Sequence, residues 1–170
     1  SGVCLRTLLG HTHWVLSFCV SADGKHLYSG SRDNTVGVWD LKRGLRARRM
    51  TCCRRMFCKD GALVRRMKGH TSYVNSVCES DGIIVSCGSD RTVNTVKKWN
   101  PSTGKCVGTL EGHSRCVQSV DANSSTICSG SQDGTVRVWN ATATVTEPKV
   151  VGHSKSVQWV QFNQKGDRLM

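Results

Sequence analysis

The chain has 170 residues and is basic, with 24 Lys and Arg against 12 Asp and Glu and a formal net charge of +12. No apolar run approaches the roughly 20 residues of a membrane-spanning helix, so we expect no membrane insertion. Several of the ten cysteines, such as Cys19, Cys87 and Cys128, fall inside strand-like patterns, where a reduced cysteine behaves as a small apolar residue. We therefore expect a reducing compartment, the cytosol or the nucleus.

The basic charge is local. Residues 42–68 hold eleven Lys and Arg and one acid, Asp60, which gives this stretch a charge of +10. The remaining chain has 13 basic and 11 acidic residues, hence only +2. Electrostatic attraction to an acidic partner or to nucleic acid would therefore come from one segment rather than from the whole surface.

The sequence repeats itself three times and begins a fourth copy. Each copy opens with Gly-His, continues to a serine-rich segment that ends in Asp, and closes on Trp. The copies are Gly10-His11, Ser29–Asp33 and Trp39-Asp40; Gly69-His70, Ser86–Asp90 and Trp99-Asn100; Gly112-His113, Ser129–Asp133 and Trp139; and Gly152-His153. The four histidines are 59, 43 and 40 residues apart. Two of these spacings match the 40–45 residues of a four-stranded propeller blade.

Each repeat predicts four strands. After each His, apolar residues recur at the fourth and seventh positions, as in Val15 and Phe18, which predicts a β-bulge near the start of the strand. Ala22-Asp23-Gly24 and Asp81-Gly82 predict hairpin turns after that strand. The second strand runs into the serine, the third carries the Trp, and the fourth strands are predicted at 62–67, 105–110 and 149–151. Residues 3–9 and 157–162 are also expected to be strands.

This pattern resembles the WD40-repeat β-propellers. The resemblance covers nearly the whole chain and implies an all-β fold. The implied fold has three complete four-stranded antiparallel blades plus the start of a fourth, and these blades do not close a ring by themselves. The expected organisation is a first repeat at 1–41, a basic insert at 42–61, a second repeat at 62–104, a third at 105–146 and a truncated fourth at 147–170. Because propellers close from about four to eight blades, we expect a fragment of a larger protein whose isolated form self-associates.

A Ser, a His and an Asp in every copy admit two interpretations. The combination could activate a serine nucleophile, as in hydrolases. The resemblance instead implies a buried hydrogen-bonded tetrad in each blade, and chemistry would need such a site only once. The implied structural tetrads are His11, Ser29, Asp33 and Trp39; His70, Ser86, Asp90 and Trp99; and His113, Ser129, Asp133 and Trp139.

Two insertions interrupt the repeat. From Trp to the next His the separation is 14 residues in the second and third copies but 31 in the first, so 17 extra residues lie between the third and fourth strands of the first blade. From Asp to Trp the separation is 6 residues in the first and third copies and 9 in the second. The second difference predicts a three-residue insertion at a turn between Asp90 and Trp99.

The basic insert carries the arginines Arg46, Arg48, Arg49, Arg54 and Arg55. A basic cluster can bind nucleic acid or act as a nuclear signal, but Phe57 is the one aromatic available for base stacking and no nucleic-acid-binding fold is recognisable. Cys52, Cys53 and Cys58 lack the paired spacing of a zinc site. The alternatives are a solvated loop and unspliced or mis-framed sequence with no selected function.

A partner-binding surface is predicted where the Gly-His loops and the Asp turns meet, at the end of the blades away from the insert. Trp14 and Tyr73 stand three residues after the Gly-His histidines, and Arg32 and Gln132 directly precede the turn aspartates. Aromatic and arginine side chains on a rigid rim are typical of interface hot spots. The alternative is that both rings cap their own blades.

The sequence favours a non-catalytic scaffold or adaptor that binds other proteins or peptides, with no cofactor, no metal and no membrane. The alternative is a nucleic-acid-associated protein that uses the basic insert. A hydrolase that uses one Ser-His-Asp set remains a third hypothesis to be tested. The sequence identifies neither the partner nor the total number of blades.

Overall fold

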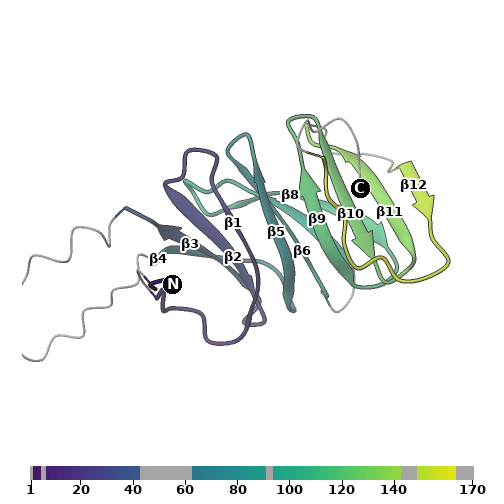
Figure 1. Ribbon diagram of the computed structural model, residues 1–170. Helices are drawn as coiled ribbons and strands as arrows, with labels where there is room; N and C mark the ends of the chain where they lie inside the picture. The colour runs from purple at the N-terminus through teal and green to yellow at the C-terminus, as the bar shows by residue number, and fades with distance from the viewer. Residues whose placement is uncertain (1, 5–6, 43–62, 91–93, 143–148, 164–170) are drawn as a thin grey trace, which may run out of the picture.

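A computed structural model describes residues 2–4, 7–42, 63–90, 94–142 and 149–163. Twelve strands form three antiparallel sheets of four, and no helix occurs among the described residues. Figure 1 shows the three sheets side by side as successive blades that fan around their first strands, without closing into a ring. The protein is an all-β propeller segment.

Each sheet follows chain order from its inner to its outer strand. The first comprises β1 (Val15–Val20), β2 (His26–Ser31), β3 (Thr35–Asp40) and β4 (Leu63–Lys68). The second comprises β5 (Val74–Ser80), β6 (Ile83–Gly88), β7 (Asn94–Trp99) and β8 (Cys106–His113). The third comprises β9 (Val117–Ala122), β10 (Thr126–Ser131), β11 (Thr135–Asn140) and β12 (Lys149–Gly152).

The local sequence explains the turns and bulges. The register shifts near the start of β1, β5 and β9, so the bulges predicted from the three-residue apolar spacing are confirmed. Asp81 and Gly82 have positive φ angles of 49° and 73°, as the two central residues of a type I′ hairpin turn require. Asn34 and Gly134 occupy the same place after the turn aspartates, with φ angles of 66° and 81°.

The core lies between blades. The face of the second sheet that carries Val74, Val77 and Ile84 packs against Tyr28, Val36, Val38 and Met67 of the first sheet, and all of these residues are buried. The third sheet packs on the second through an equivalent cluster that contains Val117, Val120 and Ile127. Gly30 marks how closely the blades approach, because a Cβ atom there would lie 2.8 Å from Val74. Each blade is therefore stabilised mainly by its neighbours.

Polar contacts also join the blades. The backbone N–H of Val77 donates to Ser17 Oγ at 3.2 Å, which ties β5 to β1. Asn75 Nδ2 donates to the carbonyl of Val117 at 2.8 Å, which ties β5 to β9. These bonds satisfy buried backbone groups where the inner strands converge.

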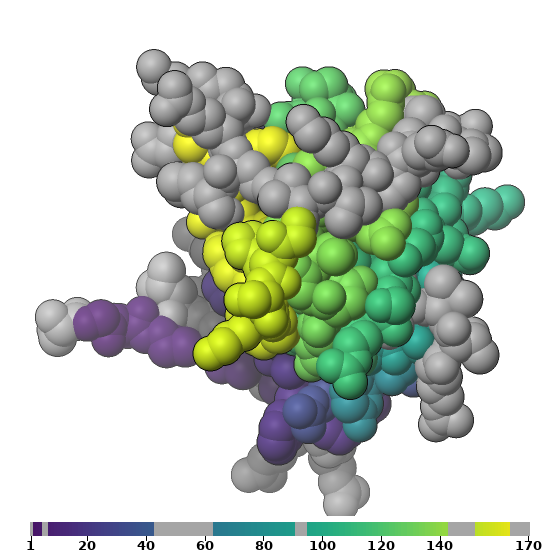
Figure 2. Space-filling view, turned by 90° about the vertical axis from the view of Figure 1, so that its right-hand side faces the viewer, coloured from purple at the N-terminus to yellow at the C-terminus, as the bar shows by residue number. Residues whose placement is uncertain are grey.

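Two predicted strands are absent from the described residues. Residues 3–4 and 7–9 form no strand, because no neighbouring described strand offers them a ladder partner. Residues 157–162 also form no strand beyond an isolated bridge at Phe162. This segment still packs on the third sheet, since Val160 is buried and exchanges hydrogen bonds with Ser119 Oγ. Figure 2 shows the C-terminal residues, in yellow, against the green strands of this blade.

Candidate functional site

The Gly-His loop, the second strand, the Asp turn and the third strand of every blade are joined by a chain of hydrogen bonds. In the first blade, His11 Nδ1 lies 2.7 Å from Asp33, His11 Nε2 lies 2.7 Å from Ser29 Oγ, and Trp39 Nε1 donates to the same Ser29 oxygen at 2.7 Å. The structure brings together the other two predicted sets with distances of 2.7–2.9 Å: His70, Ser86, Asp90 and Trp99, and His113, Ser129, Asp133 and Trp139.

The donors and acceptors fix the proton positions in this chain. An indole N–H only donates, so the serine oxygen accepts it and gives its own proton to His Nε2. The imidazole is then neutral, and its Nδ1–H donates to the aspartate. If Nε2 were also protonated, the imidazole and the indole would both donate to the same serine oxygen. The serine proton would then lose its acceptor in the network. A neutral histidine is therefore the form that satisfies the network.

Each tetrad aspartate accepts several hydrogen bonds. One of its donors is a threonine that the sequence did not point to. Burial by itself would raise the pKa of Asp33, but hydrogen bonds from Thr35 and His11 outweigh it and lower the pKa to about 2. Thr135 and Thr95 donate in the same way to Asp133 and Asp90. The repeated Asp-x-Thr pattern of the first and third copies is the sequence signal that could have identified Thr35 and Thr135, whereas Thr95 stands five residues after Asp90.

The Ser-His-Asp distances alone match those of a nucleophilic triad, but the serines of the second and third blades are out of a substrate's reach. Ser86 and Ser129 are 0% exposed, and each hydroxyl oxygen already accepts a tryptophan N–H. A nucleophile must reach the reacting atom of a substrate. Among the described residues, no group of three or more His, Cys, Asp or Glu side chains could hold a metal ion.

The free energy of unfolding is expected to fall on acidification in two steps. Burial lowers the pKa of His113 below its usual 6.5 despite its bond to Asp133, and the nearby Arg137 adds to this effect. The unfolded chain then takes up the proton first, so stability is present above pH 6.5 and is lost as the pH falls below it. The second step follows below about pH 4, where the unfolded aspartates titrate before Asp33.

Thermal unfolding measured from pH 7.5 to pH 3 tests this expectation. The His113→Gln variant, which keeps a polar side chain but does not titrate, should show a smaller decrease between pH 6.5 and pH 5 than the wild type. A melting temperature that rises on acidification would contradict the assignment of a neutral histidine.

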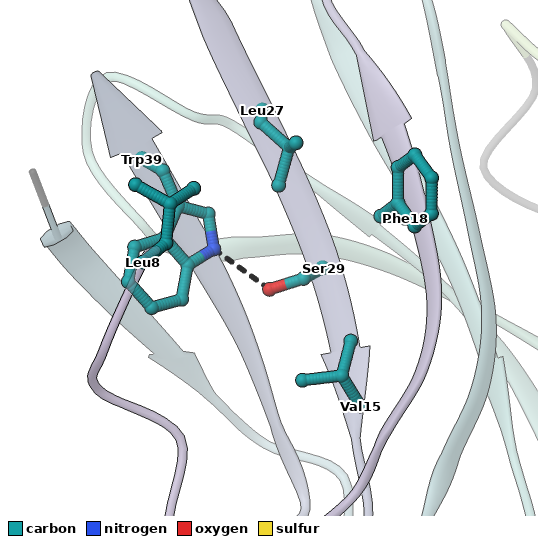
Figure 3. A pocket seen from close by; sticks show the side chains of 6 residues that line it. All are labelled: Leu8, Val15, Phe18, Leu27, Ser29 and Trp39. Atoms are coloured by element: carbon teal, nitrogen blue, oxygen red, sulfur yellow. Dashed lines mark hydrogen bonds between the residues drawn. The ribbon is translucent and has the colours of Figure 1, made fainter. Parts of the chain in front are cut away.

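The first blade has a hollow of about 200 Å³ on its open face, lined by Leu8, Val15, Phe18, Leu27, Ser29 and Trp39. Figure 3 shows these side chains around the hollow, with the hydrogen bond from Trp39 to Ser29 beside it. Val15 is 52% and Phe18 67% exposed. Their equivalents in the second blade, Val74 and Val77, are buried against the preceding sheet. The hollow is thus the uncovered side of a blade-to-blade interface.

The rim of the first two blades carries a cluster that we call the aromatic clamp: Trp14, Arg32 and Tyr73. The Arg32 guanidinium carbon lies 4.3 Å from the centre of the Trp14 ring and 5.1 Å from that of Tyr73. The backbone supports this placement, since the Arg32 N–H donates to the Trp14 carbonyl at 2.9 Å. Both rings remain accessible, at 65% and 43% exposure.

Gln132, the fourth residue predicted for the binding surface, lies on the third blade. It is exposed, and its backbone N–H bonds the Cys116 carbonyl as Arg32 bonds Trp14. The five arginines of the basic insert, at positions 46, 48, 49, 54 and 55, lie outside the described residues. The described residues contain no apolar helix of membrane-spanning length.

The sequence matches known repeat proteins over most of its length. The family model for "WD domain, G-beta repeat" matches residues 2–40, 61–100 and 104–140. A ribosome biogenesis protein WDR12 homolog from Nematostella vectensis is 32% identical over 143 residues, which cover 79% of this chain and 29% of that protein. Autophagy-related protein 16 from Arabidopsis thaliana is 27% identical over 174 residues, which cover all of this chain and 30% of that protein. The chain thus spans about three tenths of the length of these relatives.

A solved structure shares the fold. The crystal structure of the computationally designed Ika4 protein matches with a TM-score of 0.74 and 28% sequence identity, over 96% of this chain and 89% of that one. Each matched segment spans a Gly-His loop and the first three strands of one sheet, and the second and third segments also include the fourth strand of the preceding sheet. The chain therefore belongs to the WD40-repeat family of β-propeller proteins.

Proposed function

We propose that this chain is a non-catalytic interaction scaffold that binds partner proteins or peptides through its loop face. By loop face we mean the Gly-His loops at 10–14, 69–73, 112–116 and 152–156 together with the described Asp turns at 31–34, 88–90 and 131–134. The three Ser-His-Asp-Trp tetrads act in this proposal as structural elements that hold each loop on its blade. Their repetition in every complete copy supports that role, because a catalytic site is needed only once.

The observation that carries the proposal is the aromatic clamp. Two accessible rings and a guanidinium from adjacent blades meet at a rim that the tetrads hold rigid. Tyr, Trp and Arg are the residue types enriched at interface hot spots. Rigid scaffolding lowers the entropy lost on binding, because these side chains are already ordered. Membership of the WD-repeat family agrees with this role.

Truncating either ring is expected to weaken partner binding. Trp14→Ala or Tyr73→Ala should cost roughly 2 kcal/mol or more of binding free energy, because a hot-spot ring loses its buried contact area. The measurement is capture of partners from a cell lysate by the immobilised variant, after its melting curve has been matched to the wild type. Trp159→Ala is the matched control, since Trp159 is 67% exposed but stands outside the clamp.

The alternative is a nucleic-acid-associated protein that binds through the basic insert. The positive charge of residues 42–68 supports it, and one similar protein is named for ribosome biogenesis. Replacing Arg54 and Arg55 by Ala decides between the two in the same experiment. The proposal would be overturned in favour of this alternative if partner capture survives Trp14→Ala and Tyr73→Ala but is lost in the arginine variant. That capture should also weaken steeply as the salt concentration rises.

The location that we propose is the cytosol or the nucleus. Free thiols are found at Cys19, Cys106 and Cys116 and at the buried Cys78, Cys87 and Cys128. Burial raises the pKa of Cys128 to about 12 and that of Cys78 well above its usual value, so both remain protonated thiols inside the core. Such thiols pack as apolar groups, as expected of a protein kept reduced.

A further inference from the structure

We propose that the aromatic clamp selects acidic peptides, with Arg32 binding a carboxylate of an Asp or Glu side chain. This inference rests on the proposed scaffold function and specifies the chemistry of its partner. It starts from an arginine whose charge has no counterion. Among the described residues, no side chain or backbone group makes an ion pair or a hydrogen bond with the Arg32 guanidinium, and its Nε is buried without a partner.

The clamp orients the guanidinium for a planar ligand. With the ring of Trp14 at 4.3 Å and that of Tyr73 at 5.1 Å, the group is held by two cation–π contacts instead of hydrogen bonds. All of its N–H donors point in the guanidinium plane, so its edge remains the bonding direction. A carboxylate fits this edge by two parallel N–H···O bonds. The exposed surfaces of the two rings lie beside this edge of the guanidinium. They would pack against the methylene groups of the acidic side chain or against a neighbouring apolar residue of the peptide.

The charge of the surrounding surface favours the same ligand. The cationic side chains of the loop face, Arg32, Arg115 and Lys155, have no exposed acidic counterpart there. The acids of the described loop-face ranges are the tetrad residues Asp33, Asp90 and Asp133, whose side chains are buried and accept hydrogen bonds within their own blades. Exposed acids such as Asp23 and Asp81 lie in the turns at the opposite end of the blades. An acidic segment can therefore reach these cations without meeting an exposed carboxylate within the described loop-face ranges.

A peptide accounts for this surface better than a nucleic acid does. Outside residues 42–68 the chain has 13 basic and 11 acidic residues, which is too balanced for strong attraction to a phosphate backbone. Each ring of the clamp also has Arg32 over it, so that less ring surface is free for base stacking. A single carboxylate with a few neighbouring contacts matches one arginine between two rings.

Selection from a random dodecapeptide library displayed on phage tests the inference with the 170-residue chain. The peptides recovered should be enriched in Asp or Glu, and as synthetic, end-capped peptides they should bind Arg32→Gln at least tenfold more weakly than the wild type. Exchanging the critical Glu of such a peptide for Gln should weaken binding to the wild type to a similar extent. Arg32→Lys, which keeps the charge but not the planar fork, should recover only part of the affinity.

Four outcomes distinguish the scaffold function, the acidic preference, the bidentate contact and nucleic-acid binding. Peptides that need Trp14 and Tyr73 but carry no acid, or that bind Arg32→Gln as tightly as the wild type, would overturn the acidic preference and leave the scaffold function standing. Peptides that bind Arg32→Lys as tightly as the wild type would overturn the bidentate contact. Peptides that ignore all three clamp residues would overturn both proposals. An eight-residue oligouridine that binds through Arg32 more tightly than every selected peptide would replace the acidic peptide with nucleic acid. Equal melting temperatures of wild type, Arg32→Gln and Arg32→Lys provide the folding control.

Discussion

Asp90→Ala is expected to lower the free energy of unfolding by about 3–5 kcal/mol, because each buried donor left without an acceptor costs about 1–3 kcal/mol. Asp90 is 6% exposed and accepts hydrogen bonds from His70 Nδ1 at 2.8 Å and from the Thr71 N–H at 2.6 Å. Its loss leaves the buried donors of His70 and Thr95 without an acceptor. The whole stability of a domain is typically 5–15 kcal/mol, so one substitution removes a large share of it.

Chemical denaturation followed by tryptophan fluorescence measures this loss, because Trp99 belongs to the same network. The corresponding decrease in melting temperature is roughly 6–20 °C for a chain of this size. Glu111→Ala is the matched control, since Glu111 is an exposed acid on β8, and it should shift stability by no more than about 0.5 kcal/mol. An Asp90→Ala protein as stable as this control would refute a structural role for the tetrad.

The strand pairing and the bulges of the fold could be predicted from the sequence because the same residue pattern recurs in each repeat. Three copies of the Gly-His and Trp positions determine which strands pair, and the spacing of Val15 and Phe18 identifies the bulge. Nine residues separate Asp90 from Trp99 instead of six, yet Trp99 Nε1 still reaches Ser86 at 2.8 Å. The three residues 91–93 of this longer turn lie outside the described residues.

What could not be predicted depends on contacts between repeats. The sequence identifies Leu8, Val15 and Phe18 as apolar, but an alternating pattern does not reveal which apolar face another blade covers. The expected strand at 3–9 fails for the same reason, since a strand forms only where a partner supplies its ladder. The aromatic clamp could be predicted only in part. The positions of Trp14, Arg32 and Tyr73 in the repeats place them at the same end of the blades. The contact of Arg32 with rings from two repeats is a tertiary contact that the repeat pattern does not show.

The 170-residue chain is expected to self-associate through the open face of its first blade. Val15, Phe18 and Val20 are 52%, 67% and 49% exposed on β1, and the first two line the hollow beside Trp39. Fully burying side chains of this kind contributes about 1.5–3 kcal/mol each, so two or three per copy supply a strong driving force. The inner strand β1 also has no described ladder partner on the side away from β2, which invites pairing with another chain.

A charge placed at Phe18 should abolish much of this association without unfolding the protein. In Phe18→Lys the new ammonium group lies in solvent, because the position is 67% exposed, so the melting temperature should stay close to that of the wild type. Val120→Lys is the matched comparison, since Val120 occupies the same repeat position in the third blade but is 4% exposed. Burying a charge there should destabilise the fold by several kcal/mol.

Sedimentation velocity across a range of protein concentrations provides the measurement. Wild type should sediment as dimers or larger species, and Phe18→Lys should shift toward the 18.6 kDa monomer at the same concentration. Wild type that sediments as a single monomer at all concentrations would show that the open face needs no cover. Association that persists unchanged in a folded Phe18→Lys protein would move the contact away from this face to another part of the surface.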